Sequence, residues 1–143
     1  MQLTAQGRED YMQHTILFAD DDLLMHRLYV PYLERAGHQV LSATTGRQAL
    51  SLAVTHLPDL ILLDINLPMK SGHEVLAYIK NNVSYRHIAV IMLTTSSSEK
   101  DILRAYDSYV NCYITKPIDA SDFMDAVIKI EDFWISIVTL PGK

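Results

Sequence analysis

Several features that define other classes of protein are missing from this sequence. Cys112 is its only cysteine, which excludes an internal disulfide and a CxxC zinc or redox site and fits a reducing cytoplasm. The N-terminus has no apolar signal core, and no run of residues approaches the roughly 20 apolar positions that cross a bilayer. We therefore expect a soluble, cytoplasmic protein that does not bind a membrane.

The chain also has fewer basic residues than acidic ones. The chain has 12 lysines and arginines against 17 acids, a net charge of -5, so its field would repel nucleic acid. Its 143 residues show no internal repeat and no linker, which indicates a single domain. Residues 1–14 are polar and are expected to form a flexible arm, and residues 15–143 are expected to form the domain.

Short apolar runs alternate with segments of helical period along the domain. Strands are predicted over Thr15–Ala19, Gln39–Ala43, Leu60–Asp64, Ile88–Thr94 and Val110–Thr115. Helices are predicted from Leu23 to a glycine cap at Gly37, over Arg47–His56 and His73–Asn81, from Ser98, and from Asp119 to about Val138. Pro31 lies inside the first of these and predicts a kink or a later helix start.

This alternation predicts an α/β fold with right-handed crossovers. The strand over Ile88–Thr94 is apolar throughout, as expected for a strand that is covered on both faces. Short loops favour a doubly wound, five-stranded parallel sheet in the flavodoxin-like order 2-1-3-4-5, with an extended C-terminal helix.

Four of the predicted strands lead into side chains with metal or phosphate chemistry. Asp20 and Asp21 follow the first strand, Asp64 ends the third, Thr94 ends the fourth and Lys116 follows the fifth. The carboxyl ends of parallel strands share one edge of the sheet, and open α/β sheets bind ligands there, where the strand order reverses. We therefore expect these five residues to form one site.

The three acids at that edge would repel one another without a cation. Their oxygen atoms favour Mg²⁺, which needs few carboxylates and leaves coordination positions for phosphoryl oxygens. Asp20, Asp21 and Asp64 are therefore predicted to bind Mg²⁺, with the backbone carbonyl of Asn66 as a further ligand.

This set of residues predicts phosphoryl transfer. Asp64 would attack phosphorus and form an aspartyl phosphate, Lys116 would neutralise the transferred group, and Thr94 would donate a hydrogen bond to it. Few residues are needed, because charge compensation supplies most of the catalysis.

Four short motifs resemble those of the two-component response regulator receiver domains. They are FADD, LLDINLPMKSG, MLTTS and YITKP. Asp64 lies 43 residues after Asp21, 30 before Thr94 and 52 before Lys116. One such motif alone is weak evidence for the family, but all four in this order and at these distances are specific evidence for it. The resemblance extends from Thr15 to Lys129.

The resemblance implies that Asp64 is the phosphoacceptor and that Mg²⁺ is the cofactor. It also implies that Thr94 and Tyr113 are switch residues, and that Pro68 and Gly72 occupy loop positions of the family. Such a protein accepts a phosphoryl group from a sensor histidine kinase and signals through a changed helix 4, strand 5 and helix 5 face. It is not an enzyme, since it catalyses only its own phosphotransfer and dephosphorylation.

The C-terminal segment narrows the resemblance. NCYITKP and the later IEDFWISIVTLP are similar to the single-domain response regulators of cyanobacterial phytochromes, which are homodimers. The last predicted helix is apolar over more than one stripe, which indicates a partner surface. The alternative is a tail that folds back on its own domain.

Two other functions use similar residues. A phosphatase of the haloacid-dehalogenase type also forms an aspartyl phosphate, but it places its nucleophile first and its acid pair last, and it carries a second acid two residues after the nucleophile. A non-phosphorylated dimeric adaptor is the third possibility. The six histidines show no ligand spacing, and we expect them to be solvated or loosely packed.

Overall fold

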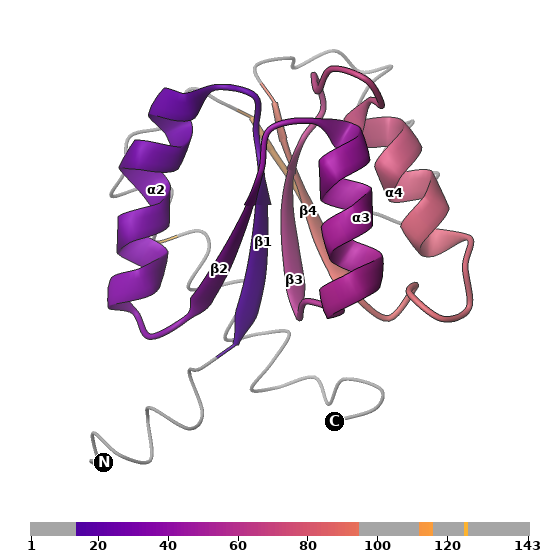
Figure 1. Ribbon diagram of the computed structural model, residues 1–143, viewed down its shortest axis with the longest axis horizontal. Helices are drawn as coiled ribbons and strands as arrows, with labels where there is room; N and C mark the ends of the chain where they lie inside the picture. Colours follow the sequence, from indigo (N-terminus) through magenta and orange to yellow (C-terminus); the bar gives the residue numbers. More distant parts are fainter. Residues whose placement is uncertain (1–13, 95–111, 116–124, 126–143) are drawn as a thin grey trace.

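The chain folds into one parallel sheet with helices on both faces (Figure 1). This computed structural model describes residues 14–94, 112–115 and 125. The sheet has five strands in the order β2-β1-β3-β4-β5, which confirms the predicted flavodoxin-like order. Their bounds are Thr15–Ala19 (β1), Gln39–Ala43 (β2), Leu60–Asp64 (β3), Ala89–Thr94 (β4) and Cys112–Thr115 (β5).

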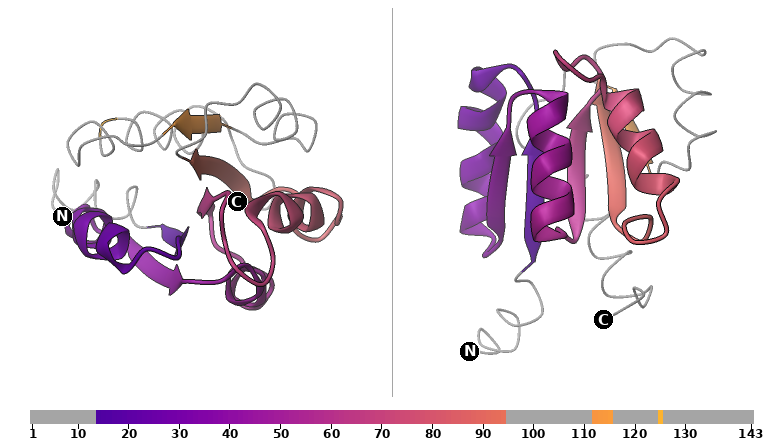
Figure 2. Two further views of the ribbon diagram at one scale, coloured as in Figure 1. Left: turned by 90° about the horizontal axis from the view of Figure 1, so that it is seen from above. Right: turned by 45° about the vertical axis from the view of Figure 1, so that its right-hand side comes forward.

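Three described helices cover the sheet. Helix α2 (Leu23–Arg35) packs on one face, and α3 (Gly46–His56) and α4 (Gly72–Lys80) pack on the other, as the view from above shows (Figure 2). Every residue of β3 is buried, which explains its unbroken apolar sequence up to Asp64. Asp64 therefore ends a strand that lies between two hydrophobic cores.

Helix α2 ends with the glycine cap that the sequence predicts. Gly37 has φ of +98°, a conformation that glycine adopts without steric cost. The N–H of Gly37 donates to the carbonyl of Glu34 at 3.0 Å, and the N–H of His38 donates to that of Leu33 at 3.2 Å. These two bonds form a Schellman motif, which directs the chain into β2.

Pro31 does not delay the start of α2, which excludes one of the two effects predicted for it. The helix runs from Leu23 with Pro31 inside it, and the Asp22 carboxylate caps it by accepting from the N–H of Leu24. The carbonyl that Pro31 leaves without a donor is that of Arg27. Arg27 is exposed, so water can replace the missing N–H.

The other helices begin one residue before their predicted starts. Thr45 caps α3 and places Gly46 in the helix. Ser71 and Glu74 form a capping box that begins α4 at Gly72, and Asn81 is the C-terminal cap. Neither N-cap was predicted, although Thr and Ser are common at such positions.

Parts of the prediction lie outside the described residues. These are most of the arm, the first two residues of the last predicted strand, and the helices expected from Ser98 and after Asp119, apart from Asp125, which is helical and exposed. His14 belongs to the domain, because its carbonyl accepts from the N–H of Gln39 at 2.9 Å. Within the described ranges, no helix is long and apolar enough to span a membrane.

The expectation that the histidines are solvated or loosely packed was wrong for two of them. His38 and His73 are buried, with exposed fractions of 5% and 4%. His38 Nδ1 lies 3.3 Å from the backbone N of His14, and His73 lies on the core side of α4, next to the loop after Asp64. The spacing of the histidines in the sequence predicts neither the contact of His38 with His14 nor the burial of His73.

Candidate functional site

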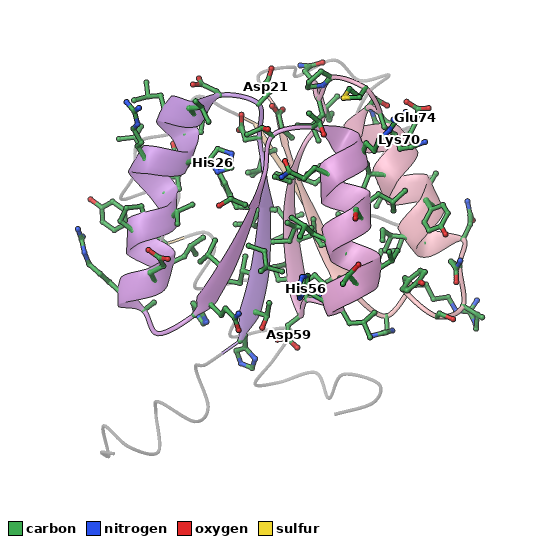
Figure 3. All side chains as sticks on the ribbon, viewed as in Figure 1. Asp21, His26, His56, Asp59, Lys70 and Glu74 are labelled. Atoms are coloured by element: carbon green, nitrogen blue, oxygen red, sulfur yellow. The ribbon has the colours of Figure 1, made fainter. Side chains whose placement is uncertain are left out.

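The strand register brings the acids of β1 and β3 together. Ala19 of β1 pairs with Leu63 of β3, so the next residues along the two strands, Asp20 and Asp64, lie side by side at the carboxyl edge. The N–H of Asp20 donates to the carbonyl of Ala43 at 3.0 Å, which extends the β1–β2 pairing by one bond. Figure 3 shows Asp21 at this edge and Asp59 at the opposite end of the sheet.

The carboxylates of Asp20, Asp21 and Asp64 form one cluster. One oxygen of each lies within 4.8 Å of those of the other two. Asp20 and Asp64 are buried, with exposed fractions of 1% and 5%, whereas Asp21 is exposed. Two buried carboxylates and a third beside them repel one another in a medium that screens charge poorly, so the cluster favours a bound cation.

Asp20 is held by three neighbouring segments. Besides the bond of its N–H to Ala43, its Oδ1 accepts from the N–H of Asp22 at 2.9 Å. Its backbone carbonyl lies 2.7 Å from Nε2 of His26, on the first turns of α2. The position of this acid is therefore fixed by the sheet, by the cap of α2 and by a side chain of that helix.

Asp64 is held by the loop that follows it. The N–H of Asn66 donates to Oδ1 of Asp64 at 3.3 Å. The N–H of Gly72 donates to the carbonyl of Ile65 at 2.9 Å. A Cβ at Gly72 would lie 2.3 Å from the carbonyl oxygen of Asp64, so only glycine lets α4 begin this close to the end of β3.

The same loop is fastened to the start of α3. The N–H of Gly46 donates to the carbonyl of Pro68 at 3.0 Å, and a Cβ at Gly46 would lie only 1.6 Å from the carbonyl oxygen of Lys70. Met69 completes the turn with φ of +72°, an uncommon conformation for a residue with a side chain. The loop is therefore held at both ends, by Asp64 and by α3.

Thr94 and Tyr113 are placed by the backbone register. Asp64 pairs with Leu93, so Thr94 is one position further along β4, at the same edge of the sheet. Tyr113 pairs with Met92, one position before Leu93. The side-chain roles of Thr94 and Tyr113 stay predictions.

Lys116 lies outside the described residues. It directly follows Thr115, which pairs with Thr94 at the end of β5. Its predicted contact with a phosphoryl group therefore rests on the sequence.

The donor atoms fit a hard divalent cation. The cluster offers carboxylate oxygens and neither sulfur nor imidazole, and Mg²⁺ and Mn²⁺ accept such ligands. Asp20, Asp21 and Asp64 would hold the ion, which would neutralise part of the charge of a transferred phosphoryl group. The predicted carbonyl ligand, that of Asn66, stays a prediction, although this residue does contact Asp64 through its N–H.

Sequence reasoning missed His26 and Gly46 as parts of this site. His26 lies five residues after Asp21 on a predicted helix, a spacing that could have directed attention to it. The clash that excludes a side chain at Gly46 depends on a loop from elsewhere in the chain, so no local signal marks it.

Comparison with known proteins agrees with the geometry. Residues 16–128 match the response regulator receiver domain family. The response regulator Rcp1 of Synechocystis sp. is 51% identical over 85 residues, which are 59% of this chain and 58% of Rcp1. This sequence match spans less than two thirds of the length of that relative.

Solved structures extend the likeness over most of the chain. The phosphorylated cyanobacterial phytochrome response regulator RcpA has a TM-score of 0.79 and 40% identity, over 91% of this chain and 99% of that one. The Mn²⁺-bound form of Rcp1 has a TM-score of 0.77 and 38% identity, over 90% and 99%. Because the family model matches most of its length and the acid cluster lies at the expected edge of the sheet, the chain belongs to the response regulator receiver domain family.

Proposed function

We propose that this chain is a cytoplasmic phosphoacceptor of a two-component system, which takes a phosphoryl group from a sensor histidine kinase onto Asp64 with Mg²⁺. The observation that carries the proposal is the acid cluster, in which the carboxylate oxygens of three residues approach within 4.8 Å at the carboxyl edge of the sheet. The likeness to the cyanobacterial phytochrome response regulator RcpA favours a phytochrome as the kinase.

The transfer is a displacement at phosphorus. An oxygen of the Asp64 carboxylate forms a bond to phosphorus as the P–N bond of the phosphohistidine breaks, and the imidazole leaves with the electron pair. In a separate dephosphorylation step, water attacks phosphorus, the P–O bond to Asp64 breaks and inorganic phosphate leaves. The N–H of Asn66, 3.3 Å from Oδ1 of Asp64, holds the attacking carboxylate in place.

Asp20 and Asp21 take no part in bond making. Their charges would hold Mg²⁺. The burial of Asp20 and Asp64, which are 1% and 5% exposed, limits the access of water to that part of the site. As predicted from the sequence, Thr94 would donate a hydrogen bond to the phosphoryl group and Lys116 would neutralise part of its charge. Because the phosphoryl group stays on Asp64 until water removes it, the chain acts as a switch and not as an enzyme for an external phosphomonoester.

A small phosphodonor tests the proposal. Incubation with phosphoramidate and Mg²⁺, followed by intact mass measurement, should add one phosphoryl group to the wild type and none to Asp64→Asn. EDTA should abolish the adduct, and the adduct should disappear over minutes to hours. No adduct on the wild type would favour a non-phosphorylated adaptor, and multiple turnover of a phosphomonoester would favour a phosphatase.

We also propose that the protein is a homodimer, with contacts on the predicted helix 4, strand 5 and helix 5 face. The support is the series of apolar residues between Phe123 and Val138 in the last predicted helix, and the resemblance to phytochrome regulators. Sedimentation at tens of micromolar should give a dimer for the full chain and a weaker one without residues 131–143. A monomer in both preparations would contradict the dimer.

A further inference from the structure

His26 reaches from α2 to the backbone of the acid pair. Its side chain points from the helix toward the sheet (Figure 3), and Nε2 lies 2.7 Å from the carbonyl oxygen of Asp20. The ring stands edge-on against Phe18 of β1, with centroids 4.9 Å apart and an interplanar angle of 88°. Packing against Phe18 fixes the plane of the imidazole, and the hydrogen bond fixes its end.

The direction of this hydrogen bond follows from its partner. A backbone carbonyl can only accept, so Nε2 of His26 carries a hydrogen and donates. This bond is made whether the ring is neutral or charged, since Nε2–H is present in both the required tautomer and the cation. The contact is therefore a fixed anchor of the backbone.

The anchored carbonyl belongs to the peptide that joins Asp20 to Asp21. A peptide unit is planar, so holding the oxygen of this unit also sets the direction of the N–H of Asp21 and of its Cα. The Asp20 carboxylate has a second anchor, the N–H of Asp22 at 2.9 Å. Asp21 is exposed, so its direction depends chiefly on the backbone that carries it.

We propose that His26 is a positioning residue for the metal site, which holds the Asp20–Asp21 peptide so that both carboxylates face Asp64. The inference rests on the proposed function, because positioning matters only if the cluster binds a cation. Groups behind the ligands of a metal site contribute to affinity in this way, and their loss costs about 10- to 100-fold.

Two substitutions at this position separate the hydrogen bond from the packing. His26→Phe keeps a ring against Phe18 and removes the donor. His26→Gln removes the ring, but its amide nitrogen reaches about as far as Nε2 and can donate to the same carbonyl. Tyr29→Leu is the matched control, since Tyr29 also packs edge-on against Phe18, at 6.1 Å, and lies one turn further along α2.

The probe is Mn²⁺ alone, titrated into the full chain and followed by electron paramagnetic resonance. We expect His26→Phe to weaken Mn²⁺ binding by about 10-fold, at the lower end of that range, and His26→Gln to recover most of this loss. Tyr29→Leu should lower the melting temperature without changing the affinity. Phosphorylation by phosphoramidate and Mg²⁺ should slow in the same order as the affinities.

The outcomes that overturn the inference differ from those that overturn the phosphoacceptor proposal. Wild-type affinity in His26→Phe, no recovery in His26→Gln, or an equal loss in Tyr29→Leu would show that His26 does not position the acids, while a phosphorylated wild type would leave the proposed function intact. A wild type that neither binds Mn²⁺ nor accepts a phosphoryl group would overturn both.

Discussion

Lys80, at the end of α4, bonds back to the chain that leads into β4. Its Nζ donates to the carbonyl of Arg86 at 3.1 Å and to that of Ile88 at 2.5 Å. Burial lowers the pKa of Lys80 from 10.5 to about 8, because desolvation penalises the ammonium. The neutral amine keeps two N–H groups, so it can still donate to both carbonyls.

This pKa predicts a particular pH dependence of stability. Between about pH 8 and pH 10.5 the unfolded chain keeps the proton that the folded chain has released, so the unfolded state binds more protons and stability rises with pH. Urea unfolding should show the wild type gaining stability relative to Lys80→Met across this window. Below about pH 8 the difference between the two proteins should stay constant.

Comparison with Lys80→Met removes the effect of other groups that titrate in this range, since both proteins contain them. A difference that does not change with pH would mean that the pKa of Lys80 is close to its ordinary value. A difference that moves in favour of Lys80→Met would mean that the folded state raises it.

Single residues are also where sequence reasoning reached its limit. Asp20, Asp21 and Asp64 could be predicted because each ends or follows a recognisable strand, and strand ends converge in a parallel sheet. His26, His38 and His73 could not, because their roles depend on a backbone carbonyl, on a contact with His14 and on burial in the core. His14 lies 24 residues from His38, and the carbonyl that His26 contacts, although only six residues away, is a backbone group that no side-chain pattern marks.

At the scale of elements, α2 presents an apolar stripe beside the site. Leu24, Leu28 and Tyr32 repeat every four residues and are 53%, 40% and 40% exposed, and Arg35 stacks over the Tyr32 ring at 5.3 Å. The stripe begins three residues after Asp21. If Asp64 accepts a phosphoryl group as proposed, the donor histidine approaches at this edge, and we predict that the stripe then contacts the kinase.

A charge in the stripe should therefore slow transfer from a kinase and leave a small donor unaffected. With an autophosphorylated cyanobacterial phytochrome kinase as donor, Leu28→Lys should reduce the transfer rate about tenfold, as expected for an interface residue worth more than about 1 kcal/mol. Its phosphorylation by phosphoramidate should match that of the wild type. Radiolabel transfer measured over time would give both rates.

Val83→Lys is the matched control for this charge. Val83 is more exposed, at 72%, and follows α4 on the way to β4, so its substitution should change neither rate. Equal transfer to Leu28→Lys and the wild type would contradict the role of the stripe. If Leu28→Lys also slowed phosphorylation by phosphoramidate, the substitution would be acting on the acid cluster and not on contact with the kinase.

Strands were easier to predict than helix ends. The first three strands have the predicted bounds, because each is a short apolar run followed by polar residues or a turn. Helix starts depended on caps, and the loop from Ile65 to Ser71 depended on Gly46, which no strand or helix pattern marks. The hydrophobic pattern predicts which elements exist, local caps set where the helices begin, and tertiary contacts set the course of the loop after Asp64.

At the scale of the whole molecule, the site depends on strand order. Only an order that sets β1 beside β3 brings the acids of two separate segments within 4.8 Å. The sequence predicts this order from short loops and right-handed crossovers, and the receiver family match decides against the haloacid-dehalogenase alternative.

The most direct measurement is the position of the phosphoryl group. The full chain would be phosphorylated with phosphoramidate and Mg²⁺ and reduced with borohydride, which converts an aspartyl phosphate to homoserine, and peptide mass spectrometry would locate the change. The account predicts homoserine at position 64 and at no other aspartate, and none when EDTA is present. Homoserine at another position, or the same yield at 64 without a divalent ion, would contradict it.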